Sequence, residues 1–271
     1  MEFMNAMKNP PKEFSPAAFW FWFGELKPDR LREQINQMKE QGVHNAFMHA
    51  RAYLKTPYLG DEWWDAISAC IDESEKIDFY PWLYDEYAWP SGTAGSIFDR
   101  GYQEPSRTLA KGECNMAKAL RSQRYASAEE FSAGKDEIDG EIIALFCGSE
   151  DNWTYINDIK DATGEILVIY KIVFSLNIDY LNPDTIRDFM NFTHEEYKAR
   201  FEKYFGNRVP GIFFDEISMA GGLPWTAKLA DTFKERCGYD IIPNLWALVI
   251  KGGDEAKKIR RDLYGKIATL D

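Results

Sequence analysis

Residues 17–50 read AAFWFWFGELKPDRLREQINQMKEQGVHNAFMHA, and this stretch decides the fold. Its apolar start, residues 17–22, is typical of a fully buried strand that ends at Gly24. Pro28 predicts the first turn of a helix, where its missing N–H costs nothing, and Gly42 predicts the end of that helix. A second apolar run follows at once. This succession predicts a parallel strand–helix–strand unit with a right-handed crossover.

The same alternation continues along the chain. Further strands are expected at residues 45–48, 79–84 and 211–214, where short apolar runs end in polar groups. Asn182, followed by proline, predicts the N-cap of a long helix that ends at Gly206. These elements together make four βα units.

The long helix is expected to bury one side. Met190, Tyr197 and Phe201 fall on that side at helical spacing. His194 is expected on the solvated side, because Lys198 stands where a zinc-protease helix carries its second histidine.

Residues 104–178 differ from the rest, because most of them lack helical periodicity. Strand-like runs occur at residues 141–147 and 165–174, and residues 161–164 (DATG) predict a hairpin turn before the second run. This segment is interpreted as a β-rich insertion after the third strand.

The predicted fold is therefore α/β, with a parallel (β/α) barrel of the TIM type that is present only in part. An eight-unit barrel typically needs about 250 residues without insertions, and an open parallel sheet is the alternative. We expect the first βα units in residues 14–103, the insertion in 104–178, and the fourth unit with the following helices in 179–271.

Composition narrows the function. The 271 residues contain 32 Lys+Arg and 44 Asp+Glu, a formal net charge of −12, which disfavours binding to nucleic acid or to an anionic membrane. No apolar run approaches the roughly 20 residues that a spanning helix needs. Residues 1–16 lack the apolar core of a secretion signal, and the four cysteines contain no C-x-x-C pair. We expect a cytoplasmic protein with reduced cysteines; its oligomeric state is left open.

Acidic pairs follow two of the predicted strands. Asp85-Glu86 comes after residues 79–84, and Asp215-Glu216 comes after residues 211–214. Function in parallel α/β folds gathers at the carboxyl ends of the strands. Two carboxylates facing each other are the basic equipment for glycoside hydrolysis. A single pair of this kind is more often a helix cap or part of a rim salt bridge, whereas two pairs on neighbouring strands in an aromatic-rich setting favour a catalytic site.

Other side chains at the same rim suit a sugar. Trp22, Tyr87 and Trp89 offer rings that can stack on the C–H face of a sugar. His49 and Arg51 are expected either to clamp a sugar hydroxyl or carboxylate, or to pair with the rim acids. With three histidines and no His-x-His pair, the sequence calls for no metal site and no cofactor.

Several longer strings resemble one known family, the α-L-rhamnosidase-like glycoside hydrolases of family 106 and its relatives. The resemblance runs from about residue 17 to about residue 245. Its most specific string is WLYDEYAWPSG at residues 82–92, and the others are FWFWFGEL (19–26), HAR (49–51), TPYL (56–59), EWW (62–64), DYLNP (179–183) and GIFFDE (211–216).

The resemblance implies a (β/α)8 barrel that hydrolyses terminal α-linked deoxysugars with inversion, with calcium as an aid in some members. It places the acidic pair on Glu86 and Glu216, with Asp85 and Asp215 as their partners, and it implies that this chain holds the first part of the barrel. The alternative is a noncatalytic carbohydrate-binding module or an inactive hydrolase fragment.

Which glutamate donates the proton is left open by the resemblance. We favour Glu216, because a wall formed by Phe213 and Phe214 would desolvate it and raise its pKa.

Overall fold

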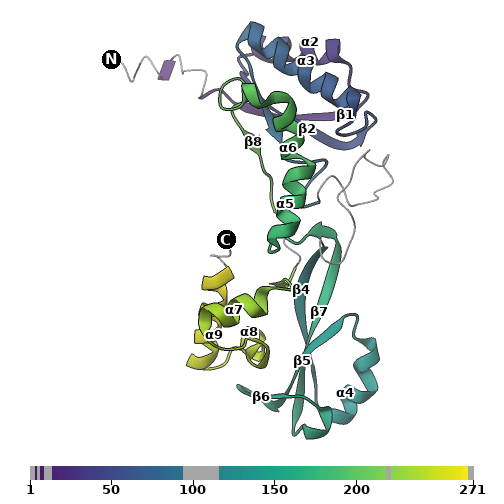
Figure 1. The fold of residues 1–271 in the computed structure, drawn as a ribbon, viewed down its shortest axis with the longest axis vertical. Helices are drawn as coiled ribbons and strands as arrows, with labels where there is room; N and C mark the ends of the chain where they lie inside the picture. Colours follow the sequence, from purple (N-terminus) through teal and green to yellow (C-terminus); the bar gives the residue numbers. More distant parts are fainter. Residues whose placement is uncertain (1–3, 5–6, 9–13, 94–115, 218–220, 268–271) are drawn as a thin grey trace. The chain divides into compact units, whose positions relative to one another are not determined.

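The computed structural model describes residues 4, 7–8, 14–93, 116–217 and 221–267. The chain forms two compact units, each with a sheet of its own (Figure 1). The first unit comprises Met1–Ala110 and Arg187–Ser218, and the second comprises Lys111–Ile186 and Met219–Asp271.

The sheet of the first unit has four parallel strands in the order β1-β2-β3-β8. They are β1 (Ala17–Gly24), β2 (Asn45–Leu54), β3 (Tyr80–Tyr84) and β8 (Ile212–Phe213). The prediction of four adjacent parallel strands is confirmed. Among the described residues β1 and β8 are the sheet's edges, so this part of the chain is an α/β fold with an open sheet and no closed barrel.

Two helices, α2 (Pro28–Glu40) and α3 (Asp61–Ile77), lie on the same side of this sheet (Figure 1). Pro28 stands at the start of α2, as predicted. Leu31 and Ile35 are the buried residues of α2, and they join the core between helices and sheet. The helices therefore cover one face of the sheet with apolar side chains.

Strand β1 is buried on that face alone. Trp22 is 2% exposed and packs edge-on against Trp63 of α3, with ring centroids 5.2 Å apart. On the opposite face Phe19, Phe21 and Phe23 are 45%, 43% and 59% exposed. The prediction of a fully buried strand is wrong, because consecutive side chains point to opposite faces and the described helices cover one of them.

The predicted long helix is broken in two. Helix α5 (Pro183–Phe192) ends before Thr193, and α6 (His194–Phe201) begins after it. The Thr193 hydroxyl donates to the Phe189 carbonyl at 3.1 Å, a bond that competes with regular helix geometry. Met190, expected on the buried side, is 45% exposed.

The sheet of the second unit is antiparallel, in the order β6-β5-β7-β4-β9. The runs predicted at 141–147 and 165–174 are confirmed, whereas three further strands have no counterpart in the prediction. The strands are β4 (Met116–Tyr125), β5 (Glu141–Ser149), β6 (Asn152–Ile156), β7 (Glu165–Ile178) and β9 (Leu223–Trp225).

The predicted hairpin turn at residues 161–164 is wrong. Strands β6 and β7 do not pair with each other, because both pair with β5, on opposite sides of it. The segment between them crosses the end of β5. The tight hairpin instead joins β5 to β6, where Ser149 pairs with Asn152.

The remainder of the chain is mostly helical, as predicted, apart from β9. One core cluster of the second unit joins Phe146 and Ile169 of the sheet to Phe233 and Leu263 of the helices. No helix of the described ranges is long and apolar enough to cross a membrane. This unit contains the helices α4 (Ala128–Gly134), α7 (Leu229–Cys237), α8 (Trp246–Val249) and α9 (Asp254–Ile267). Short 3-10 helices occur in the described part of the chain at η2 (Lys135–Glu137), η3 (Ile159–Asp161), η4 (Glu202–Tyr204) and η5 (Ile242–Asn244).

Candidate active site

The two acidic pairs lie at the ends of neighbouring strands. Strand β3 pairs with β8, and the Asp85 N–H donates to the Phe213 carbonyl at 3.1 Å, one residue beyond the end of β3. Asp85-Glu86 and Asp215-Glu216 thus both lie at the carboxyl ends of the strands, on the same side of the sheet. This convergence follows from parallel order, because carboxyl ends of parallel strands meet on one side.

One serine ties these strand ends together. The Ser91 hydroxyl donates to Asp85 Oδ1 at 2.9 Å and accepts from the Asp215 N–H at 3.0 Å. The Tyr84 hydroxyl donates to Asp215 Oδ2 at 3.1 Å. The loop after β3 is therefore fastened to the end of β8. Ser91 was not among the predicted site residues, although it lies inside the most specific string of the sequence.

Glu86 is enclosed by its own loop. It is 1% exposed, and its carboxylate accepts from the Gly92 N–H, from the Thr93 N–H at 3.0 Å and from the Thr93 hydroxyl at 2.6 Å. A carboxylate surrounded by donors is stabilised in its ionised form. Glu86 thus shapes the segment between β3 and residue 93, a role that spacing alone did not reveal.

Asp85 is a buried acid with an unsatisfied oxygen. It is 0% exposed, and Oδ2 has no hydrogen-bond partner among the described residues. Burial, and then the nearby Glu86 carboxylate, raise the pKa of Asp85 to about 8. Near neutral pH the Asp85 carboxyl therefore carries a proton in much of the population.

Asp215 and Glu216 lie at the rim. Asp215 is half-buried, and its Oδ1 accepts from the Glu216 N–H at 2.8 Å. Glu216 is exposed. The predicted desolvation of Glu216 is not present in this structure, because Phe214 itself is 40% exposed and shields little.

His49 is buried and neutral. Its ring stacks on Tyr84 with centroids 3.4 Å apart and an interplanar angle of 12°. Nε2 lies 2.9 Å from the Ala88 carbonyl, which only accepts, so Nε2 carries the proton and Nδ1 does not. Desolvation lowers the pKa of His49 to about 4. Nδ1 has no partner among the described residues, and His49 is 0% exposed.

The remaining candidates divide by exposure. Trp22 and Tyr87 are core residues, 2% and 3% exposed, and Tyr87 packs against Tyr58. Trp89 is 41% exposed and remains available to a ligand. The Arg51 guanidinium lies 4.7 Å from the centroid of the Phe21 ring, on the face of the sheet that the helices leave open.

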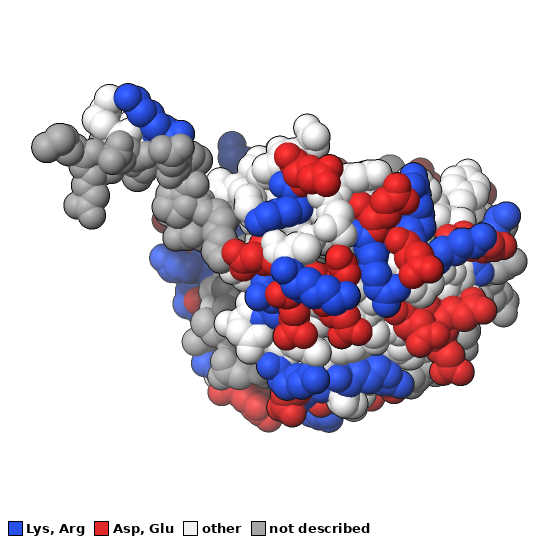
Figure 2. All heavy atoms as spheres, turned by 90° about the horizontal axis from the view of Figure 1, so that it is seen from above, with Lys and Arg blue, Asp and Glu red and all other residues white. Residues whose placement is uncertain are grey.

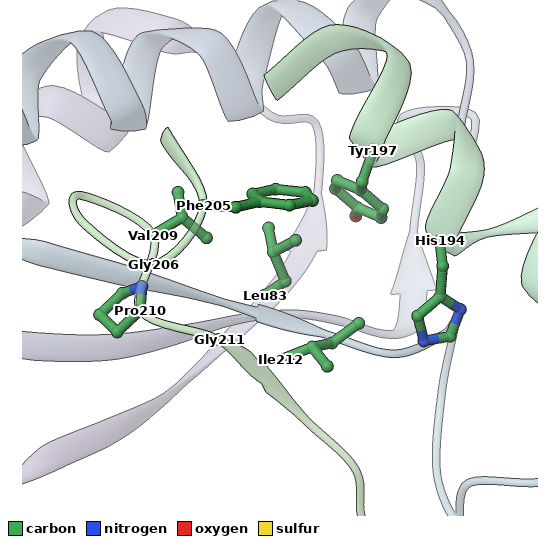
Figure 3. A pocket seen from close by; sticks show the side chains of 9 residues that line it. All are labelled: Leu83, His194, Tyr197, Phe205, Gly206, Val209, Pro210, Gly211 and Ile212. Carbon is green, nitrogen blue, oxygen red and sulfur yellow. The ribbon is translucent and has the colours of Figure 1, made fainter. Parts of the chain in front are cut away.

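An apolar pocket of about 210 Å³ lies beside β3 and β8, and none of these acids lines it (Figure 3). Leu83 and Ile212 line it from the strands, and Tyr197 and His194 line it from α6. The prediction that His194 is solvated is wrong: it is half-buried, and its Nδ1 lies 2.7 Å from the Thr193 hydroxyl. Burial lowers its pKa. The lining contains no carboxylate, whereas glycoside hydrolysis uses a pair of them.

Among the described residues no cluster of His, Cys, Asp and Glu side chains could hold a metal ion. The face seen in Figure 2 mixes Lys and Arg with Asp and Glu, without a broad patch of either sign.

Comparison with known proteins supports the resemblance. The family model of glycoside hydrolase family 106, described as alpha-L-rhamnosidase, matches residues 173–270, a range that includes Asp215 and Glu216 but not Glu86. No curated protein matches the chain.

One solved structure is similar in fold, a rhamnosidase from Novosphingobium sp. PP1Y. Its sequence is 14% identical, the TM-score is 0.59, and the match covers 98% of this chain but 46% of that one. The chain therefore spans about half the length of this similar protein. The predicted resemblance to rhamnosidase-like glycoside hydrolases is confirmed.

Proposed function

We propose that this chain is part of a glycoside hydrolase that cleaves terminal α-linked sugars of the rhamnoside type. The observation that carries the proposal is the junction of β3 and β8, where Ser91 ties Asp85 to Asp215 beside both glutamates. The family match over residues 173–270 supports the same chemistry. The proposed substrate is a carbohydrate. The proposed location of the protein is the cytoplasm, as predicted above.

The reaction inverts the anomeric centre, with Glu216 as general acid and Glu86 as general base. Inverting enzymes hold their two carboxyl groups about 6.5–9.5 Å apart, so that water fits between base and sugar. Exposed Glu216 can reach the leaving oxygen of a bound glycoside. Glu86, held by donors, suits the ionised partner. Trp89 and Arg51 contact the sugar, and His49 and Asp215 position the groups around it.

The fold proposal is that of a partial TIM-type barrel. The four parallel strands of the first unit are its first strands, and the β-rich segment 104–178 interrupts it between residues 14–103 and 179–271. The likeness in fold to a rhamnosidase structure of about twice the length supports this arrangement.

A second candidate function is noncatalytic sugar binding. The enclosure of Glu86 favours it, because a carboxylate that accepts several bonds from its own loop has few lone pairs left for water.

The test is hydrolysis of aryl α-L-rhamnosides with good and poor leaving groups. Glu216→Gln is expected to lower turnover on the poor leaving group by at least ~100-fold, the usual scale of a general acid. The loss on the good leaving group should be smaller, because it needs little protonation. Equal losses would move the acid role to Glu86, and full activity would exclude Glu216 from the chemistry.

Wild-type protein separates the two candidate functions. Thermal stabilisation by monosaccharides without release of nitrophenol would favour the binding module. Release of nitrophenol would favour the hydrolase.

A further inference from the structure

The second unit contains a pocket of about 440 Å³, within the size range of small-molecule sites, whose lining combines charged and apolar side chains. Its lining includes Lys118 from β4, Lys171 from β7 and Trp225 from β9. None of the acids discussed above belongs to this unit.

Lys118 and Asp179 form the floor of the pocket. They are 7% and 3% exposed, and Lys118 Nζ lies 3.5 Å from Asp179 Oδ2. Lys118 Nζ also donates to the Met116 carbonyl at 2.9 Å. An ammonium has three N–H groups. Two of those of Lys118 have partners among the described residues, so the third can donate to a ligand.

Asp179 is held in place from two further sides. The Leu181 N–H donates to its Oδ1 at 3.1 Å, and the Thr226 side chain hydrogen-bonds to its carboxylate. Thr226 itself is 3% exposed. Lys118 and Asp179 therefore present both donors and acceptors to the pocket.

A second ion pair lies at the rim. Lys171 Nζ and Glu141 Oε2 are 2.6 Å apart, and their side chains are 15% and 63% exposed. Two lysines and two carboxylates thus line one pocket, and their charges cancel. Ile143 and Trp225 complete the wall with apolar surface.

From this lining we propose that the pocket binds a neutral saccharide unit, as a site separate from the acidic pairs. A hydroxyl group both donates and accepts, so it can pair with an ammonium and a carboxylate together. The apolar wall suits the C–H groups of a sugar ring. An anionic ligand would be repelled by Asp179 and Glu141, and a cationic ligand would be repelled by Lys118 and Lys171. For either sign of charge the repulsion offsets the attraction to the other pair, so a charged ligand gains no net electrostatic attraction.

The test is titration of the whole chain by calorimetry and ligand-observed NMR. The neutral probes are methyl α-L-rhamnopyranoside and methyl α-D-glucopyranoside, and the charged probes are D-glucuronate and D-glucosamine. At least one neutral probe is expected to bind, and more tightly than either charged probe. Preference for a charged probe, or binding of none, would overturn the proposal.

Two variants of one exposed residue locate the binding. Ala227 lines the pocket and is exposed, so Ala227→Trp is expected to fill the mouth and weaken binding at least ~10-fold without unfolding the chain, whereas Ala227→Ser leaves it unchanged. Unaltered binding in Ala227→Trp would overturn the proposal.

A third variant separates this site from the proposed active site. Trp89→Ala changes the rim of the first unit, where the proposed active site contacts its own sugar, and it is expected to leave unchanged the separate binding event that Ala227→Trp weakens. Loss of binding in Trp89→Ala alone would place the sugar at the acids instead, and would leave the proposed hydrolase intact. Hydrolysis of aryl rhamnosides by Ala227→Trp is expected to match that of the wild type.

Discussion

At the scale of single residues, Ser91 joins the two acidic pairs of the candidate active site. It satisfies one oxygen of buried Asp85 and the backbone N–H of Asp215, and it comes from a loop rather than from either strand. Removing a partner from a buried polar group costs about 1–3 kcal/mol.

We therefore expect Ser91→Ala to lower the free energy of unfolding by about 1–3 kcal/mol, measured as a shift of the urea midpoint. The matched control is Ser132→Ala, since Ser132 is exposed and bonds only within its own helix, to the Ala128 carbonyl. Equal midpoints for both variants would show that the bonds of Ser91 contribute nothing.

Asp85 predicts a dependence of stability on pH. Its folded pKa of about 8 lies above the model-peptide value of 3.8, so the folded state binds more protons, and stability from this group falls as pH rises between these values. His49, with a folded pKa of about 4, has the opposite sign below its ordinary 6.5. The effect of Asp85 should therefore be clearest between about pH 6.5 and 8.

In that window the wild type should lose stability with rising pH, and Asp85→Asn, which cannot ionise, should lose less. Urea unfolding at both ends of the window measures the difference. Asp29→Asn is the control, because the side chain of Asp29 is 99% exposed. A wild-type slope retained in Asp85→Asn would assign the dependence to another group.

At the scale of elements, the two faces of β1 differ in how deeply their side chains are buried. Its residues alternate between a helix-covered face and an open one, so neighbours in sequence meet different surroundings. Trp22 packs on α3, whereas Phe21 lies on the open face, edge-on to His49 with centroids 5.5 Å apart.

Trp22→Ala should lower the free energy of unfolding by about 3–5 kcal/mol, the cost of removing a large buried ring. Phe21→Ala, one residue away, should cost less than about half as much, because 43% of Phe21 is already exposed. Chemical denaturation of the two variants compares them directly. Similar losses would mean that the open face is covered in solution.

At the scale of the whole molecule, the two units have separate cores. Ile71 belongs to the cluster of the first unit and Ile169 to one cluster of the second, and the clusters share no residue. Substitutions at sites without shared partners add within about 0.3–0.5 kcal/mol.

Ile71→Val and Ile169→Val should each cost about 0.5–1.5 kcal/mol, and the double variant should show the sum. Ile67→Val with Ile71→Val is the control pair, because these residues lie one turn apart on α3 in the same cluster and are expected to couple. Coupling between Ile71 and Ile169 as large as in the control pair would mean that the two cores are energetically connected.

The sequence by itself determined the parallel strands, the helix that begins at Pro28 and the N-cap Asn182, whose Oδ1 accepts from the Asp184 N–H at 3.1 Å. These depend on periodicity and on residues that act on their nearest neighbours. It also predicted that two acidic pairs leave one edge of the sheet, since parallel order alone brings the strand ends together.

Only the tertiary structure decided the rest. The crossing of β5 between β6 and β7 and the pairing of β9 with β4 depend on contacts between segments far apart in the chain. The same holds for the site: the pKa of Asp85 is raised because its surroundings exclude water, and the ends of β3 and β8 are joined because a loop brings Ser91 between them. Burial and hydrogen-bond partners are properties of the folded neighbourhood, which local patterns of residues do not encode.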